Sequence, residues 1–200
     1  MSIPAIPLAC AHRPKRGGLV VPYVAFEHNG KDTFGALDPH KQARAFESRL
    51  CQICEKPLDP WFYVLVRPQD ASIGYASEPG LHPPCLFYSE QACPMLNGSA
   101  ATYRSDGVIS RHPAGRPCED PSCSCPVTAP TKEDQRRASS KADDWDAWML
   151  PQYHLRRDAK GKAVGIELPS TPPKRIRRVR VSPERKRALA LVEALQSLGL

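Results

Sequence analysis

Two apolar stretches near the start of the chain, separated by a polar turn, predict a β-hairpin. Residues 19–27 (LVVPYVAFE) are rich in β-branched and aromatic side chains, and residues 32–37 form the second stretch. The Asn29-Gly30 pair between them tolerates positive φ at both central positions of a tight turn. We therefore expect an antiparallel pair of strands here.

A helix is expected directly after this hairpin. Asp38 has the side chain of a helix N-cap, and Pro39 suits the first helical position. Over residues 39–50 the apolar side chains recur at helical spacing, which places Phe46 and Leu50 on one buried face.

The middle of the chain predicts two strands and a second helix. Residues 61–66 (WFYVLV) have a strong strand pattern, and residues 71–77 are expected to return beside them after a polar turn. The two consecutive prolines after His82 are tolerated only in the first turn of a helix. A helix is therefore expected to begin at His82 and to end before Pro94.

The composition limits the size of the core. The 200 residues include 22 prolines, which fit poorly inside helices and central strands. A small core of this kind is often stabilised by a metal ion. Residues 1–18 are Pro-rich and basic and are expected to be a disordered N-terminal tail, which leaves residues 19–96 as the core.

The second half of the chain has weaker periodicity. Residues 97–144 are rich in Pro, Ser, Gly and charge, which predicts a linker. Residues 145–173 are expected to return to the core, with a hairpin formed by residues 152–158 and 163–168. Residues 174–200 are expected to form a basic arm and an amphipathic C-terminal helix.

The net charge of +7 is concentrated in that arm. Residues 174–187 include eight basic residues and a single acidic one, Glu184. In the rest of the chain the numbers of positive and negative charges are equal. Such a cluster suits phosphate backbones, so DNA or RNA is a predicted partner. The alternative is a solvated tail or the charged outer face of a strand. The predicted nucleic-acid-binding residues are Lys174, Arg175, Arg177, Arg178, Arg180, Arg185, Lys186 and Arg187.

The C-terminal helix offers a different class of partner. It is expected over residues 183–198, with Ser182 as N-cap, and its leucines line one side. This apolar side would pack on the protein's own core, dimerise, or dock in a groove of another protein.

The sequence favours a cytoplasmic protein without membrane contact. No apolar run approaches the length of a membrane span. The first residues lack the basic region of a signal peptide. Without an export signal, metal binding is a better explanation than disulfides for the eight cysteines.

Two short-spaced pairs of potential ligands predict a zinc site. Cys51 and Cys54 form a C-x-x-C pair that can fold as a knuckle, and His82 and Cys85 lie three apart at the start of the predicted helix. The positive end of that helix favours the Cys85 thiolate. A knuckle, a hairpin and a ligand-bearing helix are the layout of a treble-clef zinc finger. Four protein ligands would make the zinc structural.

A second metal site is a weaker possibility. Three cysteines lie within eight residues, and either His112 or Cys10 would be the fourth ligand. The spacing is unusual for zinc, and a reduced loop or a facultative disulfide explains it as well. One zinc ion is expected, or two if this cluster binds metal. Cys93 is expected to be a small buried residue. The residues of the second cluster are His112, Cys118, Cys123 and Cys125.

Nothing in the sequence predicts an enzyme. Treble-clef nucleases of the HNH type need a histidine base on the hairpin, and residues 55–81 contain no histidine. Phosphate-binding and nucleophile motifs are also missing from the sequence.

Several motifs together resemble a known group of proteins. The runs FGALDP, LCQIC and LHPPCLFYSEQACPML, with VPYVAFE upstream, are similar to uncharacterised zinc-binding proteins of actinobacteria and their phages. The likeness covers about residues 20–98 and implies a cytoplasmic zinc protein without an assigned reaction. Glu55 stands where typical knuckles have Gly, which makes the tight turn less ideal.

These observations predict a small α+β protein with a treble-clef zinc core, flanked by hairpins and flexible segments. The first functional hypothesis is a non-enzymatic, nucleic-acid-associated or regulatory protein. The alternative is a protein–protein adaptor, in a phage or host regulatory role, that docks through its C-terminal helix. A degenerate HNH-like nuclease relative is a weaker alternative.

Overall fold

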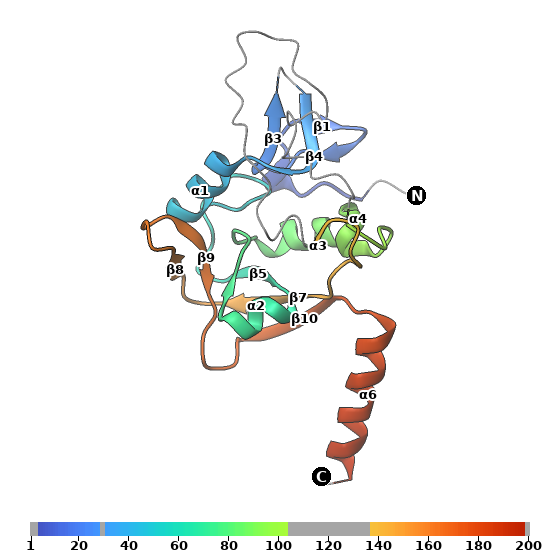
Figure 1. The fold of residues 1–200 in the computed structure, drawn as a ribbon. Helices are drawn as coiled ribbons and strands as arrows, with labels where there is room; N and C mark the ends of the chain where they lie inside the picture. Colours follow the sequence, from blue (N-terminus) through green and yellow to red (C-terminus); the bar gives the residue numbers. More distant parts are fainter. Residues whose placement is uncertain (1–3, 29–30, 104–136, 199–200) are drawn as a thin grey trace.

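The computed structural model describes residues 4–28, 31–103 and 137–198, and this part is a mixed α+β protein (Figure 1). The predicted α+β class is therefore confirmed. The elements in chain order are η1 (Leu8–Cys10), β1 (Lys15–Arg16), β2 (Leu19–Val20), β3 (Ala25–His28), β4 (Lys31–Leu37), α1 (Pro39–Glu47), β5 (Phe62–Val66), α2 (Pro68–Ile73), β6 (Tyr75–Ala76), α3 (Pro83–Ala92), α4 (Pro94–Asn97), β7 (Trp145–Leu150), β8 (Leu155–Arg157), β9 (Ala163–Glu167), β10 (Arg175–Arg180) and α6 (Pro183–Ser197).

The N-terminal hairpin and the helix after it form as their local sequence predicts. β3 pairs with β4 in an antiparallel ladder. α1 begins after Asp38, whose side-chain oxygen accepts hydrogen bonds from the backbone N–H of His40 at 2.8 Å and of Lys41 at 3.1 Å. These contacts satisfy two of the free N–H groups at the helix start.

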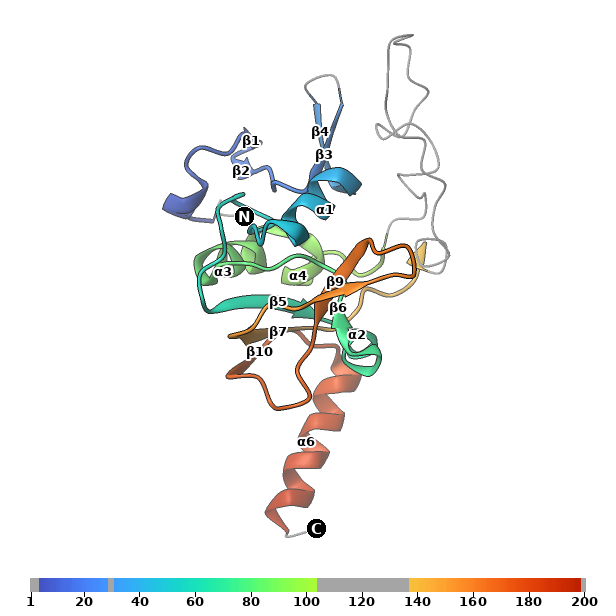
Figure 2. The same ribbon diagram turned by 90° about the vertical axis from the view of Figure 1, so that its left-hand side faces the viewer.

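β5 is the strand around which the described part is organised. It pairs with β7, and β7 pairs with β10, in an antiparallel sheet of the order β10-β7-β5. Every residue of β5 is buried. Successive side chains point to opposite faces of a strand, so Tyr63 and Leu65 join one core and Phe62 and Val64 join another. Figure 2 shows α3 and α4 on one side of this sheet.

The predicted second strand over residues 71–77 is wrong for most of its length. Residues 68–73 form α2, and only Tyr75 and Ala76 form a strand, β6, which pairs with β9. Local chemistry explains the helix: Pro68 occupies its first turn, and the Asp70 carboxylate accepts a hydrogen bond from the backbone N–H of Arg67 at 2.9 Å. Gly74, with φ of 81°, ends it.

The N-terminal segment also differs from the prediction of a disordered tail over residues 1–18. Residues 8–10 form η1, and β1 pairs with β2 across a turn of two glycines with positive φ. Cys10 is fully buried. The composition favoured disorder, but burial of Cys10 and Val20 in the core that contains Tyr63 attaches this segment to the body of the protein.

The second half of the chain contributes strands to both three-stranded sheets. β7, expected in the returning segment 145–173, is the middle strand of the central sheet. β8 and β9 form the predicted hairpin, and β6 pairs with the other edge of β9. Of the predicted linker, residues 104–136 lie outside the described residues.

The chain ends in a helix that projects from the body. α6 begins after Ser182, whose hydroxyl accepts a hydrogen bond from the backbone N–H of Arg185 at 3.2 Å, as the N-cap prediction requires. No residue of α6 is buried, and both views show the helix extending away from the sheets (Figures 1 and 2). Among the described residues, no helix has the length and apolar character needed to cross a membrane.

Candidate metal centre

The first pair of candidate ligands lies on a tight turn after α1. The backbone N–H of Glu55 donates to the carbonyl of Cys51 at 3.0 Å, and the N–H of Cys51 donates to the carbonyl of Lys56 at 2.9 Å. Glu55 adopts a left-handed conformation with φ of 65° to close the turn. The knuckle predicted for Cys51 and Cys54 is therefore formed, although a residue other than Gly occupies its left-handed position.

The second pair lies at the start of α3. His82 is the N-cap, and Cys85 lies in the first turn after two prolines. The position of His82 is set by β5, because the backbone groups of Leu81 and Tyr63 exchange two hydrogen bonds of 2.8 Å. β5 thus positions the start of α3 beside the knuckle.

These two pairs meet in the interior of the protein. One donor atom from each of Cys51, Cys54, His82 and Cys85 lies within 4.8 Å of the other three. The three cysteines are 0% exposed and His82 is 7% exposed. The fold therefore brings together all four residues that the sequence motif singled out, from segments 28 or more residues apart along the chain.

The hydrogen bonds of His82 assign roles to its two ring nitrogens. Nε2 lies 2.8 Å from the carbonyl oxygen of Pro57, and a carbonyl only accepts, so Nε2–H is the donor. In the neutral ring Nδ1 then carries the lone pair, and it lies 3.3 Å from the Cys54 Sγ. A carbonyl that fixes the tautomer of a ligand histidine is a common feature of zinc sites.

The donor set fits a tetrahedral zinc ion. With Zn–S bonds near 2.3 Å and Zn–N bonds of about 2.0–2.1 Å, a sulfur and a nitrogen on one ion lie roughly 3.5 Å apart. The distance of 3.3 Å between Cys54 and His82 is close to this value. Three thiols and an imidazole are also the ligand types that favour zinc over magnesium or calcium.

The close packing of these groups shifts their pKa values. Cys51, and then Cys54, raises the pKa of His82 to about 10, because thiolates favour the imidazolium. Contact with Cys10, and then with Cys51, lowers the pKa of Cys54 and raises the pKa of Cys85. Buried thiols in contact cannot all ionise together without a compensating charge. A bound metal ion would supply such a charge.

A fifth donor, missed as a ligand of this site by the sequence analysis, lies against the cluster. The Sγ of Cys10 is 3.8 Å from the Sγ of Cys85, and Cys10 is completely buried. The sequence analysis considered Cys10 only as a fourth ligand for the cluster at residues 118–125, whereas the structure shows its thiol beside Cys85. Cys10 lies 41 residues before Cys51, so the spacing of the two ligand pairs could not identify it.

The predicted second metal cluster lies outside the described residues. This holds for His112, Cys118, Cys123 and Cys125 alike. Cys93 is described, is partly exposed, and does not belong to the group of four donors.

The predicted basic arm is not a free arm. Residues 175–180 form β10 in the central sheet. Arg177 makes two hydrogen bonds to the Glu90 carboxylate, at 2.6 and 2.8 Å. Arg180 donates to the carbonyl oxygens of Met95 and Ala100, both at 2.8 Å. These arginines join β10 to α3 and to the segment around α4.

Two further arginines converge on one carboxylate. The Asp146 Oδ2 accepts from Arg178 at 3.1 Å and from Arg185 at 2.6 Å. The Lys174 ammonium lies 3.9 Å from the centre of the Trp61 ring. Of the eight predicted phosphate-binding residues, the exposed ones for which the structure gives no such contact are Arg175, Lys186 and Arg187.

Comparison with known proteins gave no match to any family model, curated protein or solved structure. The resemblance to actinobacterial and phage proteins therefore stays a prediction. The interpretation of the site depends on the geometry of its own residues.

Proposed function

We propose that the chain is a non-enzymatic zinc-binding protein in which Cys51, Cys54, His82 and Cys85 hold one structural Zn²⁺. The observation that carries this proposal is the meeting of four buried donor atoms, from two distant segments, within 4.8 Å. A divalent cation offsets the electrostatic cost of packing these groups together.

A structural role is supported by the closure of the site. Four protein ligands fill a tetrahedral coordination sphere and leave no position for water or substrate. The ligands come from the knuckle, which follows α1, and from the start of α3. The ion would therefore hold these two segments together. We interpret the knuckle, β5 and α3 as a treble-clef-like arrangement, in which the predicted hairpin is reduced to the Tyr63–Leu81 bridge.

Metal analysis of the purified protein tests this proposal. We expect close to one zinc per chain, or two if the cluster at residues 118–125 also binds. Cys51→Ser combined with Cys54→Ser should lose one zinc per chain, because the loss of both knuckle thiols leaves too few ligands for a tetrahedral site. Cys93→Ser is the matched control and should keep the wild-type zinc content. Zinc content near zero in the wild-type protein, or unchanged in the double variant of Cys51→Ser and Cys54→Ser, would contradict the proposal.

The compartment belongs to the same proposal. The described cysteines are free thiols, and a reducing cytoplasm keeps thiols available to metal. An oxidising compartment would favour disulfides between such close sulfurs.

A nucleic-acid-associated role is the functional proposal for the basic segment. It is supported by three exposed basic side chains, namely Arg175 at the start of β10 and Lys186 and Arg187 in the first part of α6. Four other arginines of the segment already make hydrogen bonds within the protein and stabilise the fold, so they are less available to phosphate groups. They are Arg177, Arg178, Arg180 and Arg185.

Charge removal at exposed positions tests this role without removing β10 from the sheet. We expect Arg175→Gln, Lys186→Gln and Arg187→Gln together to weaken DNA or RNA binding. The slope of log affinity against log salt should fall by roughly 2–3, at about 0.9 per lost duplex contact. The matched control removes three exposed charges elsewhere, at Arg156, Lys160 and Lys162. If the control variant weakens binding as much as the test variant does, the binding is only a nonspecific attraction between the net charge of the protein and the nucleic acid.

A protein–protein adaptor is the second candidate function. Leu191 (62% exposed) and Leu198 (73% exposed) lie on a helix with no buried residue. Arg187 precedes Leu191 by one helical turn and shares its face. The partner that fits this helix is a protein groove with an apolar floor and acidic rims.

A photo-crosslinker at Leu195 separates the two candidates. Capture of one protein partner that is lost on Leu191→Asp supports the adaptor, and capture of nucleic acid supports the phosphate-binding role. The weaker hypothesis, a degenerate HNH-like nuclease, would require metal-dependent cleavage of DNA by the purified protein.

A further inference from the structure

Cys10 occupies a position that suits a ligand of the same ion. Two sulfurs bound to one tetrahedral zinc ion lie roughly 3.8 Å apart, given Zn–S bonds near 2.3 Å. The Sγ atoms of Cys10 and Cys85 are separated by 3.8 Å. Cys10 is 0% exposed, so its thiol is confined to this interior. The centre therefore contains five potential donors for an ion that binds four.

The segment that carries Cys10 is held onto both ligand-bearing elements. Three residues after Cys10, the Nη1 of Arg13 lies 3.0 Å from the Oε2 of Glu55, which follows Cys54 on the knuckle. The backbone N–H of Val20 donates to the Tyr88 hydroxyl of α3 at 2.8 Å.

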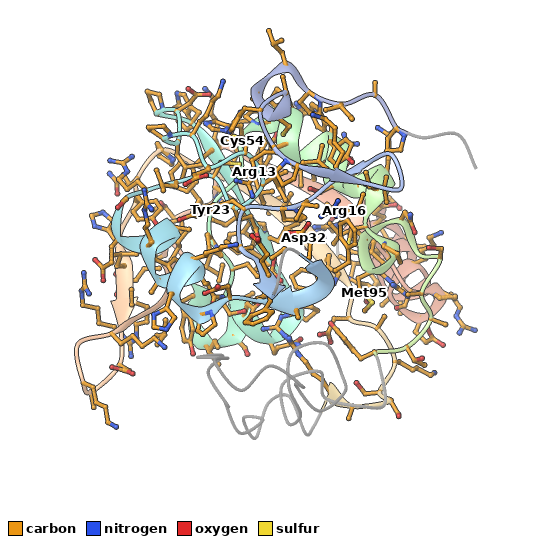
Figure 3. All side chains as sticks on the ribbon, turned by 90° about the horizontal axis from the view of Figure 1, so that it is seen from above. Arg13, Arg16, Tyr23, Asp32, Cys54 and Met95 are labelled. Atoms are coloured by element: carbon orange, nitrogen blue, oxygen red, sulfur yellow. The ribbon has the colours of Figure 1, made fainter. Side chains whose placement is uncertain are left out.

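Further contacts around Arg13 hold the N-terminal segment against the knuckle. Its guanidinium also lies over the Tyr23 ring, 5.5 Å from the centre, and Figure 3 shows Arg13 and Tyr23 beside Cys54. The backbone of Tyr23 donates to the carbonyl of Ile53 on the knuckle at 3.1 Å. Cys10 is thus positioned by contacts that do not depend on its own sulfur.

Cys10 and His82 both lie against the thiol cluster. The Sγ of Cys10 is 3.8 Å from the Sγ of Cys85, and the Nδ1 of His82 is 3.3 Å from the Sγ of Cys54. His82, and not Cys10, is among the four donors that all lie within 4.8 Å of one another. The three remaining thiols, Cys51, Cys54 and Cys85, are common to both possible sets of four.

We propose that Cys10 is an alternative ligand of this metal centre, which competes with His82 for the fourth coordination position. This inference rests on the proposed function, because it adds a donor to the same site. When Cys10 replaces His82, the bond from the metal to Nδ1 breaks and a bond to the Cys10 Sγ forms. The thiol proton of Cys10 passes to the released imidazole. The centre then has four sulfur ligands, and the N-terminal segment is attached to the core by coordination.

Metal-binding measurements on four proteins test this inference. The background is the full chain with Cys118, Cys123 and Cys125 replaced by Ser, so that only this centre is counted. The proteins are the background itself, Cys10→Ser, His82→Ala and the double variant. Zinc stoichiometry and competition with a chelator give the affinity of each, and Cys93→Ser is the matched control.

Each single variant is expected to keep one zinc, because one of the competing ligands remains. The double variant should lose more affinity than the product of the two single losses, by on the order of 10-fold or more. Cobalt substitution gives a second readout. The sulfur-to-cobalt absorption should strengthen in His82→Ala, where Cys10 adds a thiolate, and should not strengthen in the double variant.

The possible failures are distinguishable. A background protein that binds no metal contradicts the proposed function itself. If the background protein binds zinc but the His82→Ala variant does not, the proposed role of Cys10 is wrong, whether or not that variant folds. The proposed function is not affected by this outcome. Multiplicative losses in the double variant overturn it as well. His82→Cys in the Cys10→Ser background restores four thiols and should bind one zinc, which checks that the double variant fails for lack of a ligand.

Discussion

Arg13 and Glu55 form an ion pair of 3.0 Å that joins the N-terminal segment to the residue that closes the metal-binding turn. Glu55 holds this contact from a left-handed backbone conformation, with φ of 65°. Glu55 therefore lowers stability through its backbone conformation and raises it through the ion pair of its side chain.

Replacement of Glu55 by Gly is expected to be nearly neutral in the wild-type protein. Relief of the left-handed conformation contributes about 1 kcal/mol, and loss of the partly buried ion pair costs about 0.2–1 kcal/mol. In an Arg13→Ala background only the backbone gain is left, so Glu55→Gly should stabilise by about 1 kcal/mol. Urea unfolding of the four proteins measures this cycle. Equal effects in both backgrounds would show that the ion pair contributes nothing.

Removal of the metal should loosen one of the two larger cores and spare the other. The core around Cys51, Cys54 and Cys85 contains the ligands, whereas the core around Val64 and Ile166 contains none. After chelation, hydrogen exchange should accelerate in the knuckle and in α3. Protection of the ladder between β8 and β9 should change little. Uniform loss of protection would show that the two cores unfold as one unit.

Asp70→Ala should destabilise the protein strongly. Arg67 and Asp70 are 4% and 1% exposed and make charge-assisted hydrogen bonds of 2.7 and 2.8 Å. Removal of the carboxylate leaves the guanidinium buried and poorly compensated, which costs about 3 kcal/mol. Thermal or urea unfolding measures the loss. The exposed pair of Arg157 and Glu47 is the control, and Glu47→Ala should cost much less because solvent screens that pair.

Glu78→Gln should stabilise the protein at neutral pH. Burial raises the pKa of Glu78 above its ordinary value of 4.5, and the attraction of Arg67 offsets only part of this effect. The folded state therefore binds the proton more tightly than the unfolded state, and the ionised carboxylate lowers stability at pH 7. The gain from the Gln variant should shrink as the pH falls towards the ordinary pKa of 4.5. A gain that is independent of pH would contradict this origin.

Local chemistry made several elements predictable. The N-caps at Asp38 and Ser182 and the helix start at His82 depend on residues close together in the sequence, and all three are found. The ligand pairs were predictable for the same reason, because each pair is set by a turn or by one helical turn. The α2 helix was missed, although Pro68, Asp70 and Gly74 are helix start and stop signals, because the flanking apolar residues suggested a returning strand.

The sequence by itself determined which four residues form the two ligand pairs, because their spacing is a property of a short length of backbone. Only the tertiary structure decided that β5 pairs with β7, that Cys10 lies beside Cys85, and that arginines of the basic segment bond to Glu90 and Asp146. These contacts join residues about 30 to 90 positions apart, so no local pattern specifies them. Periodicity identifies a strand such as β5 as buried but does not name the segments that bury it.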